Sequence, residues 1–90
     1  MVQNINVRTN SETSNYVLST TVIKTFNILE YIAANQPVSP PDVAKGLQLP
    51  RSSVHRLLAT LVSMGYVTKD KSGYYLSFKL FELGNSIPLS

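Results

Sequence analysis

The chain has no cysteine and a single histidine among its 90 residues. Disulfides, thiolate metal sites and sites built from several histidines are therefore excluded. No apolar run approaches the roughly 18 residues that a membrane span needs. The N-terminus has no basic segment followed by an apolar core, which argues against a secretory signal. These absences predict a cytoplasmic protein that uses no cofactor and no metal and has no membrane partner.

Acidic side chains are also few. Five acids face eight Lys and Arg, for a net charge of +3. Residues 50–64 contain Arg51 and Arg56 and none of the acids. A mildly basic chain is weak evidence for nucleic-acid binding, but the separation of these arginines from the acids strengthens it. One histidine and scattered acids provide no cluster for an active site, so we predict that the chain is not an enzyme.

Residues 50–64, PRSSVHRLLATLVSM, form the stretch around which the other elements are arranged. At about 100° per residue, Leu57, Leu58 and Leu61 fall within about 60° of Val54, which predicts an aliphatic core stripe. The outward and flanking residues are Ser52, Ser53, His55, Arg56, Ala59, Thr60 and Ser63. A solvated helix face usually mixes Glu with Lys, and this face has no acid. We interpret it as the helix that enters a DNA groove.

A first helix is predicted over residues 19–35. The apolar residues that share one face are Val22, Phe26, Leu29 and Ala33, with Ile32 beside them. Their spacing of 4, 3 and 4 is typical of an amphipathic helix, and we expect this stripe to be core. The residue before Pro37 is pushed out of the helical region, so the helix is expected to end there.

A second helix is predicted from Pro40 to about Gly46. Ser39 is suited to the N-cap, and proline fits the first helical position. Gly46 or Gln48 is expected to take the left-handed conformation that closes this helix. Two helices joined by three or four residues, the second with a polar outer face, are a helix-turn-helix.

A β-hairpin with strands at residues 66–69 and 74–77 is predicted next, because turn-forming residues separate two β-favouring runs. A hairpin in this place is a wing, with Lys69 and Lys71 at its tip. Its three tyrosines are interpreted as packing residues rather than as stacking platforms for single strands.

Residues 78–86 return to a helical pattern with two apolar sides. So short an element cannot bury both sides on a small domain, which implies a partner copy or a following domain. The residues assigned to dimerisation are Phe78, Leu80, Phe81, Leu83 and Ile87.

Three motifs occur in order: TVIKTFNILEYIAA at 21–34, LPRSSVHRLLATLVSMGYV at 49–67 and YYLSFKLFELG at 74–84. Together they resemble the N-terminal winged helix-turn-helix of IclR-type transcriptional regulators. The resemblance implies operator binding by this domain. It also implies a larger C-terminal domain that binds a small-molecule effector and helps assemble oligomers, for which 90 residues have no room.

The resemblance also implies DNA contacts for Ser52 and Ser53, which open the recognition helix, and for Arg56 and Lys24. Two positions depart from the family pattern. Gln48 and Ser77 stand where the family often has glycine, which makes the turn geometry at Gln48 less certain.

The predicted fold is mostly α with a small β-hairpin: a winged helix-turn-helix with a three-helix core, a two-stranded wing and a short linker helix. Residues 1–18 are expected to be a flexible arm, 19–77 the DNA-binding domain and 78–90 the linker helix and chain end. We expect a homodimer that reads a partly palindromic operator, as a repressor or an activator. The alternative is a winged-helix module that binds another protein and not DNA.

The predicted DNA-binding residues are Lys24, Ser39, Arg51, Ser52, Ser53, His55, Arg56, Thr60, Lys69 and Lys71. Arg56 can grip a phosphate or a guanine edge with its fork, the alternative being a pair with a nearby acid. The helix start already favours a phosphate, although a serine there could instead cap the helix. For Lys69 and Lys71 the alternative is solubility alone.

Overall fold

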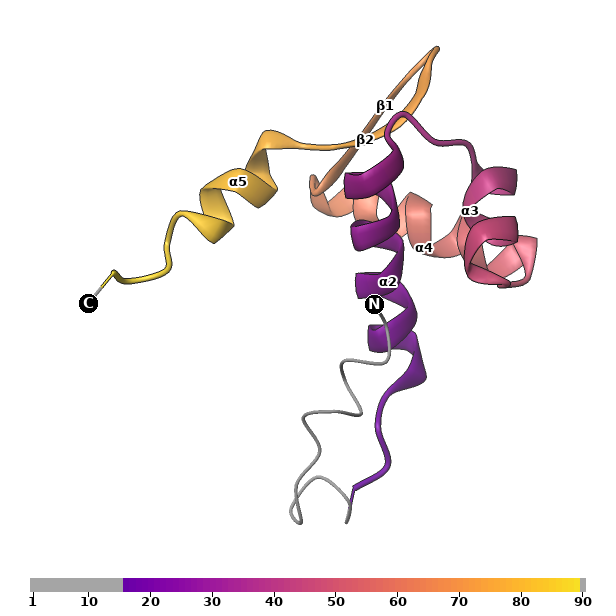
Figure 1. Cartoon of the computed structure of the whole chain (residues 1–90), viewed down its shortest axis with the longest axis horizontal. Helices are drawn as coiled ribbons and strands as arrows, with labels where there is room; N and C mark the ends of the chain where they lie inside the picture. Colours follow the sequence, from indigo (N-terminus) through magenta and orange to yellow (C-terminus); the bar gives the residue numbers. More distant parts are fainter. Residues whose placement is uncertain (1–15, 90) are drawn as a thin grey trace.

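The computed structural model describes residues 16–89. In this part of the chain, three helices and a two-stranded sheet enclose a small core, and a fourth helix follows the sheet (Figure 1). The elements are α2 (Thr20–Asn35), α3 (Pro40–Leu47), α4 (Arg51–Met64), β1 (Val67–Asp70), β2 (Gly73–Leu76) and α5 (Phe78–Gly84). This arrangement confirms the predicted winged helix-turn-helix. Most of the predicted arm at residues 1–18 lies outside the described residues.

Local sequence signals set most helix ends. The Ser19 hydroxyl accepts a hydrogen bond from the Val22 N–H at 3.2 Å, and the Ser39 hydroxyl accepts one from the Asp42 N–H at 3.3 Å. Both are N-caps that satisfy an unpaired donor of the first turn. Gln48 closes α3 with a φ of 56°, as predicted for one of two candidates.

The other candidate, Gly46, lies inside α3, where it lets α3 approach α2. A Cβ at Gly46 would overlap the ring of Tyr31. The absence of a side chain therefore serves packing at this position rather than a turn.

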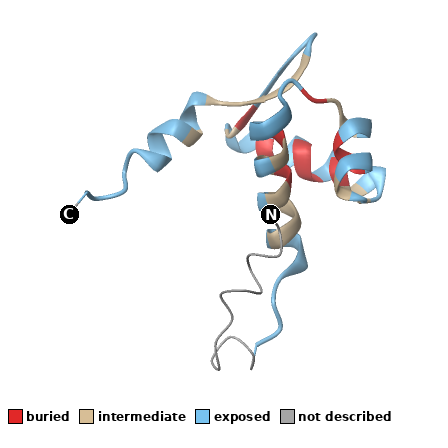
Figure 2. Ribbon diagram, in the orientation of Figure 1, coloured by how far each residue is buried: buried red, intermediate tan, exposed pale blue. Residues whose placement is uncertain are grey.

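The core is aliphatic and lies where α2, α3, α4 and the hairpin meet (Figure 2). Its α4 side is the predicted stripe of Val54, Leu57, Leu58 and Leu61, all buried. The other buried residues are Ile28, Ile32, Val38, Val43, Ala44 and Val67. Burial of one complete face explains why α4 takes a single rotation about its axis, which points its polar face outward.

The predicted core stripe of α2 is only partly right: Ile32 beside it is buried and Leu29 packs against the core, but the other three residues of the stripe are exposed. Val22 is 54% exposed and Phe26 is 58% exposed, whereas Ile28 and Ile32 are fully buried. The two sides differ by roughly 120° around the helix, at 100° per residue. Helix α2 has two apolar sides, and α3 and β2 pack against the one that carries the isoleucines.

Both strands of the hairpin lie one residue closer to the turn than predicted. Val67 pairs with Leu76 and Asp70 with Gly73, in antiparallel register. Val38, between α2 and α3, pairs with the hairpin as well, which no local sequence pattern predicts. It exchanges two backbone hydrogen bonds with Tyr74, at 3.1 and 2.9 Å. This pairing ties the wing to the start of α3.

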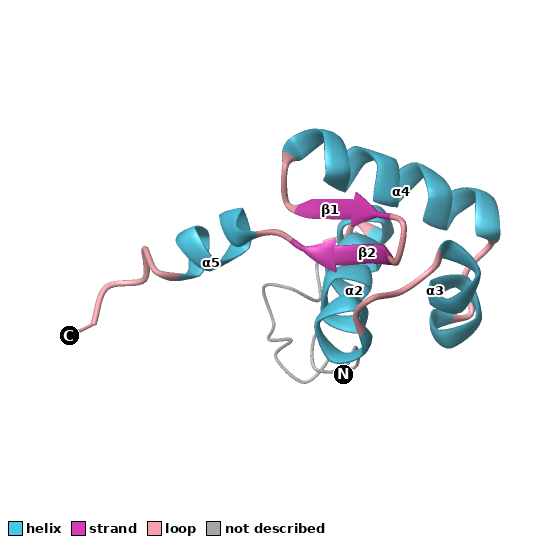
Figure 3. Ribbon diagram, turned by 90° about the horizontal axis from the view of Figure 1, so that it is seen from above, coloured by secondary structure: helices cyan, strands magenta, loops and turns pink. Residues whose placement is uncertain are grey.

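Helix α5 projects away from the body formed by α2, α3 and α4 (Figures 1 and 3). It ends at Gly84, earlier than predicted, so Ile87 lies beyond it. All of α5 except the half-buried Leu80 is exposed, including Phe78 at 68% and Phe81 at 59%. The expected exposed apolar surface is therefore present.

Candidate nucleic-acid interface

The outer face of α4 is polar and basic, as its sequence predicts. Arg51, Ser52 and Arg56 are exposed, and Ser53 is half-buried near the helix start. The N-cap position is Pro50, whose side chain cannot accept a hydrogen bond. The alternative that a serine caps this helix is therefore wrong. No side chain caps the first-turn N–H groups, and such groups favour an anion.

Thr60 lies further along the same face and is exposed. Its hydroxyl donates a hydrogen bond to the Arg56 carbonyl oxygen at 2.9 Å. With its proton used in this way, the hydroxyl oxygen can act as an acceptor from a base amino group. A phosphate, which itself only accepts, would require the hydroxyl to turn.

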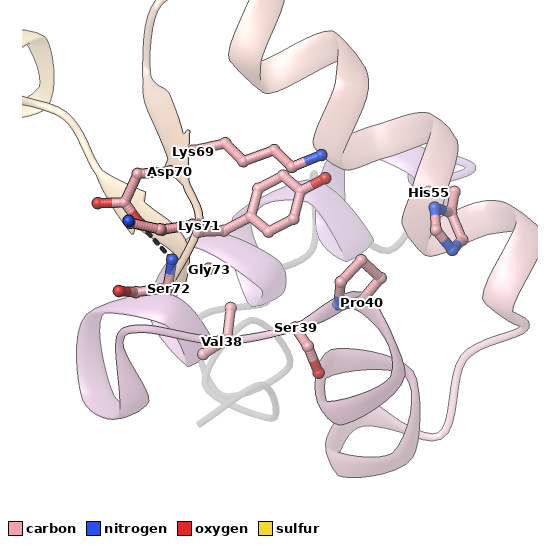
Figure 4. Close-up of a pocket in the computed structure, with 10 residues that line it drawn as sticks. Val38, Ser39, Pro40, His55, Lys69, Asp70, Lys71, Ser72 and Gly73 are labelled. Carbon is pink, nitrogen blue, oxygen red and sulfur yellow. Dashed lines mark hydrogen bonds between the residues drawn. The ribbon is translucent and has the colours of Figure 1, made fainter.

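A groove of about 380 Å³ runs between α4, the start of α3 and the wing (Figure 4). It brings together four of the predicted contact residues from three parts of the chain. They are Ser39, His55, Lys69 and Lys71. The fold thus brings side chains that are up to 32 positions apart in sequence, from Ser39 to Lys71, to one groove beside the recognition helix.

Lys69 extends across this groove toward the helix that carries His55 (Figure 4). Its ammonium nitrogen lies 5.4 Å from the centroid of the Tyr74 ring, which belongs to the cross-strand partner of Lys69. This distance is typical of a cation–π contact, which orders a long side chain. Asp70 also lines the groove, where its Oδ1 accepts from the Ser72 N–H at 2.7 Å and stabilises the turn.

Lys24 lies elsewhere, half-buried in the second turn of α2. Six groove residues were not among the predicted contacts: Val38, Pro40, Asp70, Ser72, Gly73 and Tyr74. Strand alternation predicts that Tyr74 shares one face of the wing with Leu76, but no sequence signal connects that face with Val38. Among the described residues, no group of three acids or histidines is arranged to hold a metal ion.

Residues 21–71, from α2 to the tip of the wing, match the model of the IclR helix-turn-helix domain. The chain belongs to this family. Two curated relatives are HTH-type transcriptional regulators named KdgR. The Dickeya chrysanthemi protein is 34% identical over 65 residues, and the Escherichia coli protein is 32% identical over 65 residues. Each match covers 70% of this chain but only 21% and 25% of the relatives' own lengths.

Two solved structures share the fold of this IclR-family chain. Pseudomonas aeruginosa HmgR has a TM-score of 0.67 and 25% identity, over 78% of this chain and 32% of that one. An IclR family transcriptional regulator from Brucella abortus has a TM-score of 0.72 and 24% identity, over 96% of this chain and 33% of that one.

The family relationship confirms the interpretation as a DNA-binding domain of transcription regulation. The relatives are regulators rather than enzymes, and the alternative of a protein-interaction module gains no support. No described helix of the IclR-family chain is long and apolar enough to cross a membrane.

Proposed function

We propose that this IclR-type domain binds a specific double-stranded operator by placing the first two turns of α4 in the major groove. The observation that carries this proposal is the arrangement around α4. An acid-free outer face begins at an uncapped N-terminus and continues into a groove lined by wing lysines. Recognition helices typically read bases with their N-terminal residues, which here are Arg51 to Arg56.

The contact residues divide into two groups by position. Arg56 and Thr60 lie on the face that would meet base edges, where Arg56 can bind guanine with both arms of its fork. Arg51, Ser52 and Ser53 lie at the open helix start, which suits a phosphate. The remaining proposed contacts to the backbone are Lys24, Ser39, His55, Lys69 and Lys71. Phosphate contacts set the register, and base contacts supply specificity.

The proposed active form is a homodimer on a partly palindromic operator. The exposed apolar residues of α5 and the chain end support it, because an aromatic pair such as Phe78 and Phe81, with ring centroids 5.1 Å apart, gains by leaving water. We assign Leu80, Leu83 and Ile87 to the same surface.

The domain division proposed for this chain is 19–77 for DNA binding and 78–90 for the linker. The chain spans about a quarter or less of the curated relatives it matches. We propose that a longer regulator supplies an effector-binding domain and acts in the cytoplasm. We also propose that it represses transcription by occupying the operator.

Selection of duplexes from a random pool, followed by affinity measurements on the winning sequence, tests the proposal. We expect a shared half-site, and a loss of affinity of at least tenfold between about 50 and 200 mM salt, because bound phosphates release counterions. Failure to enrich any sequence, with no duplex binding at low salt, would overturn DNA reading by this domain. It would instead favour a protein partner.

A further inference from the structure

The end of α4 and the start of α5 are joined by a cluster of polar contacts. The last turn of an α-helix leaves carbonyl groups without partners inside the helix. Gly65, with a φ of 89°, closes α4, and the Tyr66 N–H reaches back to the Leu61 carbonyl at 3.0 Å. The carbonyl oxygens of Met64 and Gly65 point onward and accept from α5 instead.

Ser77 makes one half of this connection. Its hydroxyl donates to the Gly65 carbonyl oxygen and also accepts from the Lys79 N–H at 3.2 Å, as the N-cap of α5. Its backbone N–H donates to the Tyr66 carbonyl oxygen at 3.0 Å. One residue therefore caps α5 and fastens it to the end of α4.

Lys79 makes the other half. Its ammonium group donates to the Met64 carbonyl oxygen at 2.9 Å and lies 4.8 Å from the centroid of the Tyr66 ring. Its stem passes over Gly65, where a Cβ would lie 3.4 Å from the Lys79 Cδ. A cation at a helix C-terminus is also favoured by the helix dipole. We call this set of contacts by Ser77 and Lys79 the clasp.

The clasp matters because little else directs α5. The helix is exposed along its length apart from Leu80, and it projects from the body (Figure 1). A helix held by burial takes its direction from packing, but α5 has only its first turn fixed. Its direction relative to α4 therefore depends on the polar contacts at that turn.

The geometry points to Ser77 and Lys79 as positioning residues for DNA reading. They fix α5 to the end of the recognition helix and thereby set how far apart two recognition helices lie when two copies join through α5. This inference rests on the proposed dimer. Lys79 touches no DNA in this scheme, so its loss changes the spacing of half-sites that is accepted and leaves the affinity for one half-site unchanged.

The first experiment measures α5 directly and needs no DNA. Because the chain has no cysteine, spin labels can be placed at Ser63→Cys on α4 and Gly84→Cys on α5 alone, and a Cβ at Gly84 would meet no atom within 4 Å. The doubly labelled chain is diluted with an excess of unlabelled chain, so that the distance measured lies within one copy. We expect a narrow distance distribution in the otherwise unchanged chain. It should broaden in Lys79→Met, which keeps the aliphatic stem but removes the donor. Lys79→Arg should restore the narrow distribution.

The second experiment measures spacing on duplexes whose half-sites are moved apart by about five base pairs, half of a helical turn. The unchanged chain should lose about tenfold or more in affinity, and Lys79→Met no more than about threefold, since a freely directed α5 lets either spacing be reached. Lys45→Met, which removes an exposed lysine of α3, is the control and should behave as the unchanged chain does.

A distribution that stays narrow in Lys79→Met would overturn the clasp. A broadened distribution with unaltered spacing preference would overturn its link to DNA reading. If the unchanged chain shows no spacing preference at all, both the proposed dimer and the proposed role in half-site spacing are wrong. The distance measurement still decides whether the clasp directs α5.

Discussion

Helices α4 and α5 both carry leucines at helical spacing, yet they lie in opposite environments. Helix α4 buries four apolar side chains against α3 and β1, and α5 leaves Phe78, Phe81 and Leu83 in solvent. Apolar spacing therefore identifies a face but not the surface that covers it. The apolar face of α4 packs against other elements of the same domain. For α5, the proposed packing surface belongs to a second copy of the chain.

The largest expected difference between these helices is in stability. Leu58→Ala in α4 should lower the free energy of unfolding by about 2–5 kcal/mol, because Leu58 is 1% exposed and a cavity would remain. Phe81→Ser in α5 should change it by no more than about 0.5 kcal/mol. Urea denaturation of both variants at low protein concentration provides the measurement.

Sedimentation of the Phe81 variant completes this comparison. We expect weaker self-association than in the unchanged chain, with an unaltered fold. A large loss of monomer stability would show instead that α5 is part of the core.

A smaller effect, confined to function, is expected on the outer face of α4. Arg56→Ala should weaken binding to the selected operator by about 1–3 kcal/mol and relax specificity at one position, with little change in melting temperature. Fluorescence anisotropy and thermal unfolding measure the two quantities. The matched control is Lys45→Ala, which removes an exposed lysine of α3 and should keep operator affinity. A fall in melting temperature for the Arg56 variant would indicate a structural role.

The smallest effect is expected at the wing. Lys69→Gln should weaken all sequences about equally and reduce the slope of log affinity against log salt by about one, because one phosphate contact is lost. Salt titrations on the operator and on an unrelated duplex would show this. A change in sequence preference would contradict a backbone role and place Lys69 on a base edge.

Much of the interface could be predicted from local sequence. The rotation of α4 follows from four residues within two turns, and the predicted cap at Ser39 depends on a hydrogen bond that spans three positions. Such features need only the geometry of one helix, so no knowledge of the rest of the fold is required.

The stripe of α2 shows where local reasoning fails. Val22 and Phe26 satisfy the same periodicity that correctly identified the core face of α4, but both are exposed, and Phe26 lines a mostly apolar pocket next to α5. Helix α2 offers two apolar sides, and the sequence does not say which one α3 will cover. That choice is made by the packing of the isoleucines.

The sequence alone thus determined the helix-turn-helix, the outward basic face of α4 and the presence of a wing, because hydrophobic period, capping and turn chemistry act over a few residues. Tertiary structure decided the features made by distant partners. The Leu76 N–H donates to the Gln36 Oε1 across 40 positions, Val38 pairs with Tyr74, and Lys79 reaches the Met64 carbonyl. These contacts share one physical reason for being unpredictable from local sequence. Each closes a loop between distant residues, and its partners come together only when the core is folded.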